Sequence, residues 1–415
     1  MRSTGFIWIV AVIMAAIDFY VFQIVKMLCQ DSSSRTKSII FTSYWVVSIS
    51  IIILFIFLPF LNTERWPKNF RNYLFATVIG FFFAKVLASV FFLVDDLRRV
   101  IQWAVAKIFF RNTEGDSQVS EGISRSVFLS WLGIGLGGSL ISSLIYGFSN
   151  KYNYRITRVP LAFPQLPSAF RGLKIVQISD VHSGSFDNKK AVEKGVQMIL
   201  DLKPDLILFT GDLINDRAEE MQEYTEVFSR LQAPMGVFST LGNHDYGDYV
   251  KWPNEQARQQ NLDDLKALQA GMGWRLLMNE HVVLEKEGQQ IALIGIENWS
   301  AKARFPKHGK MWEAYPGAEK YPFKILMSHD PSHWDAEVRP KYGDIDLTLA
   351  GHTHGMQFGI ELPGFKWSPV KYVYDQWAGL YEEGKQKLYV NRGYGFIGYP
   401  GRVGILPEIT LIELV

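Results

Sequence analysis

The chain is poor in cysteine and has almost no net charge. Among 415 residues there is one cysteine, Cys29, so no intrachain disulfide can form and a disulfide-stapled secreted scaffold is excluded. The 43 Lys and Arg residues are balanced by 41 Asp and Glu residues, which leaves a formal net charge of +2. A surface that binds nucleic acid through bulk positive charge is therefore not expected, and partners must be recognised by local features.

The first 150 residues contain few charges and four long apolar stretches. These stretches are Phe6–Leu28, Ile39–Leu61, Tyr73–Val94 and Val127–Phe148. Each reaches the ~20 residues that an α-helix needs to cross a bilayer core of about 30 Å. Four buried helices of a soluble domain are the alternative, but a soluble core rarely offers four such runs. The sequence therefore predicts a four-helix transmembrane domain over residues 1–150.

Two ionisable residues interrupt these stretches, Asp18 in the first and Lys85 in the third. Charges at membrane depth usually face a partner or a water-filled cavity, so we expect the two to pair within the helix bundle. A structural clamp is favoured over a proton or ion path, because one pair does not make a relay. The fourth stretch carries Gly133, Gly135, Gly137 and Gly138, which favours close helix packing.

The sequence gives only weak signals for the side of the membrane on which the C-terminal domain lies. Loops on the two sides, with their flanks, hold eight and seven Lys or Arg residues, which is nearly a tie. The stretch "SRSVFLSWLGIGLGG" (124–138) resembles a twin-arginine export signature, although Ser126 replaces the second arginine and Ser130 the lysine. This resemblance implies a bacterial inner-membrane protein whose C-terminal domain lies on the extracytoplasmic side.

The segment between the third and fourth stretches allows two interpretations. Residues 97–111, "LRRVIQWAVAKIFFR", mix basic and bulky apolar side chains and can lie in the interface as an amphipathic helix. A plain extension of the third helix is the alternative. The polar stretch that follows, up to residue 124, predicts a loop.

After the membrane domain the chain changes character. Residues 151–170 contain Pro160, Pro164 and Pro167 and predict a connector that resists helix formation. From residue 171 to 415, short apolar runs alternate with amphipathic stretches such as 188–202 and 257–270, which predicts an α/β domain. The expected buried strands are "LKIVQIS", "DLILFT", "GVFSTL", "QIALIGI", "FKILMS", "IDLTLA", "KLYVN" and "ITLIEL".

Polar side chains follow five of these strands at the point where each ends. They are Asp180 and His182, Asp212, Asn243 and His244, His329, and finally His352 and His354. The carboxyl edge of an open α/β sheet is where ligands bind, so these groups are expected to converge. Each motif alone is weak evidence, because a histidine after a strand is more often simply hydrogen-bonded. Five in order point to one site.

With His244 set aside, the set comprises two Asp, one Asn and four His, without a thiolate. Such oxygen and nitrogen donors suit Mn, Fe or Zn. One ion takes about four to six ligands, so seven groups indicate two divalent ions that share one carboxylate. The spacing of His352 and His354 allows the two rings to diverge towards different ions, and glycines at 211, 242, 351 and 355 allow the tight turns required.

These blocks resemble the calcineurin-like metallophosphoesterases, whose ordered D-x-H, G-D, G-N-H-D/E, H and G-H-x-H motifs are all intact between residues 171 and 415. The ending "NRGYGFIGYPGRVGILPEITLIEL" is similar to the bacterial YkuE-type membrane-associated subgroup. The resemblance implies an αββα two-sheet sandwich. It also implies one metal on Asp180, His182, Asp212 and His354, and a second on Asp212, Asn243, His329 and His352. His244 would be the catalytic acid, oriented by Asp245.

The expected activity is hydrolysis of a phosphate mono- or diester or a pyrophosphate by metal-activated water, at the bilayer and on a lipid-linked substrate. Aromatic residues after the histidine motif can contact an acyl chain or simply pack: Phe358, Phe365, Trp367, Tyr372, Tyr374 and Trp377. Some relatives cleave a lipid-linked pyrophosphate that faces the cytoplasm, which conflicts with an outward domain. The alternatives are a broad phosphodiesterase tethered to the membrane, and a non-catalytic receptor or transport module.

Overall fold

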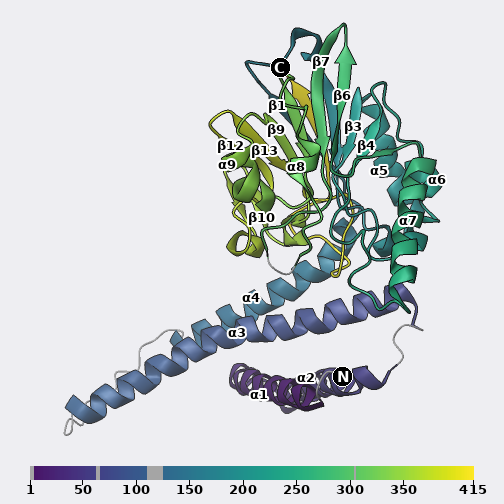
Figure 1. Cartoon of the computed structure of the whole chain (residues 1–415). Helices are drawn as coiled ribbons and strands as arrows, with labels where there is room; N and C mark the ends of the chain where they lie inside the picture. Colours follow the sequence, from purple (N-terminus) through teal and green to yellow (C-terminus); the bar gives the residue numbers. More distant parts are fainter. Residues whose placement is uncertain (1–3, 62–65, 110–124, 303–304) are drawn as a thin grey trace. The chain divides into compact units, whose positions relative to one another are not determined.

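The structure is a computed structural model that describes residues 4–61, 66–109, 125–302 and 305–415. It consists of two compact units, Met1–Tyr146 and Gly147–Val415, which we call the membrane unit and the α/β unit. The first is built from long helices and the second from two β-sheets with covering helices (Figure 1).

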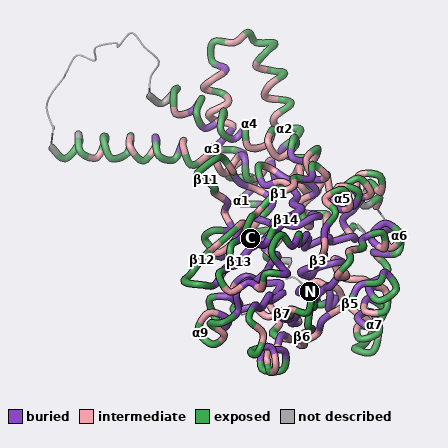
Figure 2. The backbone as a smooth tube through the Cα atoms, turned by 90° about the horizontal axis from the view of Figure 1, so that it is seen from above, coloured by how far each residue is buried: buried purple, intermediate pink, exposed green. Residues whose placement is uncertain are grey.

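The described part of the membrane unit contains four α-helices: α1 (Thr4–Leu28), α2 (Ser34–Phe57), α3 (Lys68–Phe109) and α4 (Arg125–Gly147). All four are long and apolar enough to cross a membrane, which confirms the predicted spans. Their surfaces are mostly exposed or half-buried, whereas buried residues gather in the α/β unit (Figure 2). Apolar side chains that face outward along such helices are suited to contact lipid.

Helix α3 continues without a break through residues 97–109. The structure therefore favours a plain extension of the third helix over a separate interfacial helix. The loop predicted up to residue 124, and the first residue of the export-like stretch, lie outside the described residues. The rest of that stretch forms the start of α4.

The predicted pairing of Asp18 with Lys85 is confirmed. The Lys85 ammonium, on α3, donates to Asp18 Oδ1 on α1 and to Ser48 Oγ on α2, the latter at 2.8 Å. The Ser48 hydroxyl lies 3.1 Å from the same Asp18 oxygen, and the Tyr44 hydroxyl donates to the Asp18 carbonyl at 2.7 Å. Three helices are thus tied together by a polar cluster whose members bond to one another.

Two of the four glycines singled out in α4 explain why small residues occur there. A Cβ atom on Gly137 would lie 2.7 Å from the Ala84 carbonyl oxygen of α3, and one on Gly133 would lie 3.0 Å from that of Ala88. The backbones of α3 and α4 therefore approach too closely for a side chain at these positions. Gly135 and Gly138 have open space instead, so the packing interpretation holds for half of the set.

The first sheet of the α/β unit has the order β1-β14-β2-β3-β4-β5. β2, β3, β4 and β5 run parallel, β14 is antiparallel to β2, and β1 pairs with β14 at the edge. The strands are β1 (Arg155–Leu161), β14 (Glu408–Leu414), β2 (Lys174–Ile178), β3 (Leu206–Phe209), β4 (Val237–Ser239) and β5 (Arg275–Leu276).

The second sheet has the order β12-β13-β9-β8-β7-β6, with parallel central strands and an antiparallel strand at each edge. A separate hairpin, β10–β11, follows the last histidine motif. The strands are β12 (Gly379–Glu383), β13 (Gln386–Val390), β9 (Leu347–Ala350), β8 (Lys324–Met327), β7 (Gln289–Gly295), β6 (Glu280–Lys286), β10 (Ile360–Leu362) and β11 (Phe365–Trp367).

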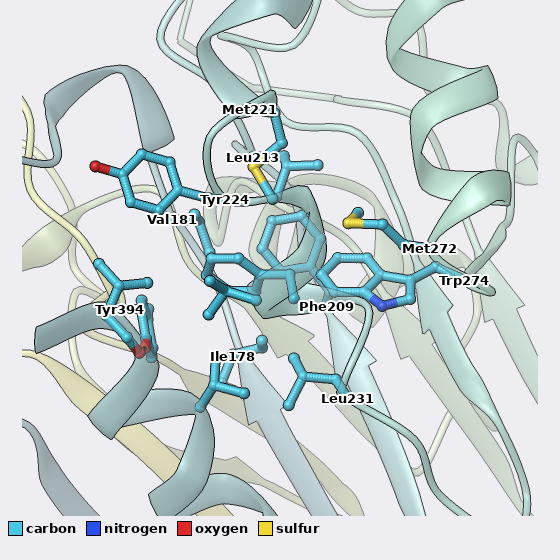
Figure 3. Packing of buried hydrophobic residues seen from close by; sticks show 14 of the residues in the cluster. Ile178, Val181, Phe209, Leu213, Met221, Tyr224, Leu231, Met272, Trp274 and Tyr394 are labelled. Atoms are coloured by element: carbon cyan, nitrogen blue, oxygen red, sulfur yellow. Dashed lines mark hydrogen bonds between the residues drawn. The ribbon is translucent and has the colours of Figure 1, made fainter. Parts of the chain in front are cut away.

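The central strands are buried on both faces. In β3, Leu206 and Leu208 pack between the sheets, whereas Ile207 and Phe209 pack beneath the helices α5 (Lys189–Asp201) and α7 (Glu255–Gly271). Phe209 meets Trp274 within this outer cluster (Figure 3). The second sheet has a corresponding outer cluster with α8 (Met311–Ala314). Two sheets between two helical layers form the predicted αββα sandwich.

All eight predicted strands are present, as are the helices predicted over 188–202 and 257–270. The sequence did not indicate β1, which lies in the proline-rich segment. Pro160 is compatible with β1 because this strand is at the sheet edge, where a missing N–H is tolerated.

Candidate metal centre

The carboxyl ends of five parallel strands carry the predicted site residues. β2, β3 and β4 of the first sheet lead into Asp180, Asp212 and Asn243, while β8 and β9 of the second lead into His329 and His352. Because both sheets present the same ends to one edge of the sandwich, the side chains meet between them. Two compact groups result.

The first group consists of Asp180, His182 and His354, whose ligand atoms all lie within 4.8 Å of one another. Nε2 of His354 is 3.2 Å from Asp180 Oδ1 and 3.1 Å from His182 Nε2. All three residues are buried. Two imidazole nitrogens and a carboxylate oxygen therefore point at a common position.

The second group consists of Asp212, His329 and His352, again within 4.8 Å. Asp212 Oδ2 is 3.1 Å from His329 Nε2, and His352 Nδ1 is 3.3 Å from the same nitrogen. Asp212 Oδ2 is also 3.6 Å from His182 Nε2 of the first group. Asp212 thus lies between the groups, and His352 and His354 belong to different ones.

Asn243 lies on β4's loop with its amide buried. Its Nδ2 donates to the Tyr249 hydroxyl at 2.8 Å, whereas its Oδ1 has no hydrogen-bond partner among the described residues. A buried polar atom without a partner is costly, so an acceptor left in this state indicates a missing ligand. The oxygen and imidazole donors fit divalent cations.

The backbone at the site is strained. Five of the seven predicted ligands adopt the left-handed region: Asp180 (φ 53°), His182 (φ 48°), Asp212 (φ 61°), His352 (φ 72°) and His354 (φ 51°). Such a conformation costs roughly 1–3 kcal/mol for a residue with a side chain, and it clusters at functional sites. The sequence contains no signal for this strain, although the neighbouring glycines are consistent with it.

Glycine is required at a position next to the ligands because neighbouring atoms leave no room for a side chain. A Cβ on Gly351 would lie 2.0 Å from Ser179 Oγ and 2.3 Å from Asp180 Oδ2. Gly211 has φ 98°, which other residues rarely adopt. The turns therefore bring the two strand ends together as the spacing predicted.

Burial and the neighbouring carboxylate set the protonation states of the site histidines. Burial lowers the pKa of His182 and of His352, so both rings are neutral and keep a lone pair for a cation. Burial also opposes charge on His329, but the nearby Asp212 outweighs it and raises the pKa of His329 to about 10. The Asp212 carboxylate therefore stabilises positive charge at this position.

His244 lies beside the first group, with its ring centroid 4.9 Å from that of His182. Its backbone N–H donates to Asp212 Oδ1 at 2.8 Å, and its Nδ1 lies 2.7 Å from the Asn215 carbonyl oxygen. The side chain is only half-buried. Nε2 is therefore the ring nitrogen that can meet a substrate.

The hydrogen bonds of Asp245 connect two loops of the site. Its carboxylate accepts hydrogen bonds of 2.8 Å from the backbone N–H groups of Asp212, Leu213 and Gly242. It fastens the β3 and β4 loops to each other, while the Asn215 carbonyl orients the His244 ring. Asp245 is thus a positioning residue for the loops that carry Asp212 and Asn243.

Sequence reasoning missed three supporting residues. The Tyr374 hydroxyl lies 2.9 Å from His352 Nε2 and donates to Asp330 Oδ2 at 3.1 Å, so it accepts from the ring and leaves Nδ1 free for a cation. The buried Arg402 guanidinium lies behind His354, with Nη2 3.3 Å from Nδ1. Of the three, only Asp330 had a signal in the sequence, because it directly follows the predicted ligand His329 in "SHDP".

Two family models match the chain in succession. The model described as "Probable Calcineurin-like phosphoesterase, transmembrane domain" matches residues 1–151. The model described as "Calcineurin-like phosphoesterase" matches residues 173–356. Together they cover the membrane-spanning helices and the strand ends that carry all seven predicted ligands.

Curated relatives agree with these matches. "Transmembrane protein with metallophosphoesterase domain" of Danio rerio is 27% identical over 322 residues, which is 75% of this chain and 67% of that protein. "Uncharacterized metallophosphoesterase YkuE" of Bacillus subtilis is 29% identical over 302 residues, 70% of this chain and 98% of the relative. "UDP-2,3-diacylglucosamine pyrophosphatase LpxG" of Chlamydia muridarum is 27% identical over 293 residues, 58% and 83% of the two chains. The chain therefore belongs to the calcineurin-like metallophosphoesterases, as an integral membrane, metal-dependent phosphoester hydrolase.

Proposed function

We propose that the protein is a dimetal phosphoesterase that hydrolyses a phosphate mono- or diester or a pyrophosphate bond of a lipid-linked substrate at the bilayer. One observation carries the proposal of two metal ions: Asp212 Oδ2 is 3.1 Å from His329 Nε2 of its own ligand group and 3.6 Å from His182 Nε2 of the other group. Two neighbouring cations are commonly held by two ligand groups that share one carboxylate.

In this proposal Asp212 is shared by two ligand sets. The first set adds Asp180, His182 and His354, and the second adds Asn243, His329 and His352. Divalent cations such as Mn, Fe or Zn, when bound, supply Lewis acidity for the phosphoryl oxygens and lower the pKa of water. Asn243 contributes a neutral oxygen, so the centre keeps more positive charge than an all-carboxylate site.

His244 is the proposed acid. Its Nδ1, held by the Asn215 carbonyl at 2.7 Å, carries a proton, so a second proton can only be added at the half-exposed Nε2. From there the imidazolium donates to the departing oxygen or to a phosphate oxygen. Asp245 supports this chemistry indirectly, because it fixes the loops on which Asp212 and Asn243 stand.

The lipid clause is supported by the four candidate spans in the same chain and by the pyrophosphatase named among the relatives. A phosphodiesterase with broad specificity and an incidental anchor is the second candidate, because the metal centre itself does not select a lipid. The two differ in which substrates they turn over.

The experiment uses the full chain in detergent, loaded with Mn or Zn. Turnover is compared on soluble aryl phosphodiesters, lipid phosphates and lipid pyrophosphates. We expect hydrolysis of a lipid substrate, and we expect Asp212→Ala to abolish it while Asp263→Ala, on the surface of α7, leaves it unchanged. Turnover of soluble diesters alone would remove the lipid clause, and full activity in Asp212→Ala would remove the metal centre.

The extracytoplasmic side of a bacterial inner membrane is also a proposal, supported by the export-like start of α4. Protease digestion of intact cells or spheroplasts tests it. We expect cleavage within residues 151–415, and complete protection would place the α/β unit in the cytoplasm.

A further inference from the structure

The hairpin β10–β11 presents apolar side chains to solvent. Among the described residues of the α/β unit, eleven large apolar side chains are exposed, and six of them fall between residues 356 and 373. We call these six the hairpin patch: Met356, Ile360, Leu362, Phe365, Tyr372 and Val373. Leu362 is 61% and Phe365 56% exposed. Such a grouping on an otherwise polar surface marks a contact with another apolar phase.

Part of the aromatic stretch behaves differently. Tyr374 and Trp377 are buried beside the metal centre, where Tyr374 bonds to His352. These two side chains are therefore not available to contact an acyl chain. Phe365 and Tyr372 remain exposed, which limits an apolar contact to the hairpin and its flanks.

The patch is joined to the end of the fourth span within the α/β unit. The last four residues of that candidate span, 147–150, already belong to this unit. The Arg402 N–H donates to the Gly147 carbonyl at 2.9 Å, and the next residue, Val403, bonds to both Gln357 and Gly359. Gly359 precedes β10, so the hairpin begins within about 15 Å of the end of the span.

Basic residues flank the hairpin. Lys366 of β11 and Lys371, four residues after β11, are exposed. A depression of about 440 Å³ beside the turn of the hairpin is lined by Leu362 and by Arg155 and Arg158 of β1. The buried Arg392 in the same depression is paired with Glu361 and Glu408. Among the residues that the structure describes, neither Arg155 nor Arg158 forms an ion pair. This surface is therefore complementary to an anionic one.

We propose that the hairpin patch inserts into the headgroup layer of the bilayer that anchors the chain. The bilayer is the occupant because the chain's own span ends beside the hairpin, and because apolar and basic side chains together suit an anionic lipid interface. The insertion rests on the proposed function only for its purpose, which is to bring the phosphate of a lipid to the metal centre.

The hairpin is also rigidly connected to the ligand loop. Met356 and His354 lie in the same 3₁₀ turn, η8 (His354–Gln357). The Ser368 hydroxyl, just after β11, donates to the Gly355 carbonyl at 2.8 Å, and the Thr353 hydroxyl donates to the Trp377 carbonyl at 2.6 Å. An inserted hairpin therefore fixes the height of the His354 loop above the membrane surface.

Fluorescence depth measurements test the insertion without any catalysis. Cysteines are introduced as L362C, F365C and W312C into full-length C29S protein, whose native cysteine is thereby removed. Trp312 on α8 is 61% exposed, like Leu362, and serves as the matched control. Each is labelled with an environment-sensitive fluorophore in phosphatidylglycerol-containing vesicles that carry headgroup-level spin-labelled lipid.

We expect a blue-shifted emission at positions 362 and 365 and several-fold stronger quenching by the spin-labelled lipid than at position 312. Equal quenching at all three positions would overturn the proposal. A label at 362 that is shielded from iodide but not quenched by the lipid would also overturn it, because a second copy or another protein would then cover the patch.

Turnover separates this inference from the proposed function. L362D/F365D is expected to lower turnover of a vesicle-embedded lipid phosphate by about tenfold or more, since burial of two large apolar side chains is lost. Turnover of a soluble aryl phosphodiester is expected to stay unchanged, which also shows that the variant folds. W312D is the control. An equal effect on both substrates would contradict the inference, whereas wild-type protein inactive on lipids but quenched at 362 would contradict only the lipid-substrate clause.

Discussion

Both units of the protein bury charged side chains, but the two clusters differ in how they are completed. In the membrane unit, Asp18 and Lys85 bond to each other and to Ser48. In the α/β unit, Asn243 Oδ1 is buried without a hydrogen-bond partner among the described residues. A closed cluster is complete without a ligand, whereas an open one requires something from outside. The difference separates a structural role from a binding role.

Removing divalent cations should have the largest effect of the changes considered, because it acts on the cluster that lacks a partner. Chelation is expected to abolish hydrolysis, and Mn or Zn to restore it, because the open cluster then regains its missing charge. Metal analysis should give two equivalents for each chain. Activity that survives exhaustive chelation would show that the cluster in the α/β unit, like the Asp18–Lys85 cluster, is complete without a metal ion.

Breaking the closed cluster should destabilise the membrane unit. Lys85→Met leaves Asp18 buried and unpaired, at a cost of about 3–5 kcal/mol, whereas replacing both residues with apolar ones is expected to be close to neutral. Unfolding of the full chain in detergent micelles measures both. Equal stability of Lys85→Met and Asp18→Leu/Lys85→Met would contradict the clamp.

A smaller effect is expected from a residue that supports the open cluster. Tyr374→Phe removes the hydroxyl that holds the His352 ring, so metal affinity or activity should fall by about 10–100-fold. Tyr372→Phe, at a side chain 74% exposed, is the matched control. Titration of the metal-free protein with Mn gives the affinity, and an unchanged value would assign Tyr374 to packing alone.

The smallest effect concerns the basic residues beside the hairpin. Each exposed arginine near an anionic surface contributes about 1 kcal/mol. R155A/R158A should therefore weaken lipid quenching of a label at position 362 in anionic vesicles but not in neutral ones. K307A/K310A, beside α8, serves as the control, and a loss in both vesicle types would indicate a structural defect instead.

Much of the metal centre could be predicted because it follows strong local patterns. The strand "IDLTLA" is a continuous apolar run, and the residues after it are restricted to one sheet edge once the strand is recognised. His352 and His354 were expected to face different ions, and the structure places them in different ligand groups. The assignment of each ligand to an ion stays a proposal.

The remaining features depend on contacts through space that leave little local pattern. β10 and β11 have three residues each, which is too short for a periodicity. Arg402 lies behind His354 although 48 residues separate them along the chain. The contacts of Asp245 were not predictable for the same reason, because its partners include backbone N–H groups of another loop.

The left-handed backbone of the ligand residues also bears on quality control in the cell. Loops that hold such conformations relax most easily when nothing bridges their side chains, so this edge of the sandwich is expected to open first in molecules that have not acquired metal. Proteases that survey membrane proteins would then meet a cleavable segment only in unloaded chains. Metal acquisition would thereby set not only the activity of each molecule but also its lifetime.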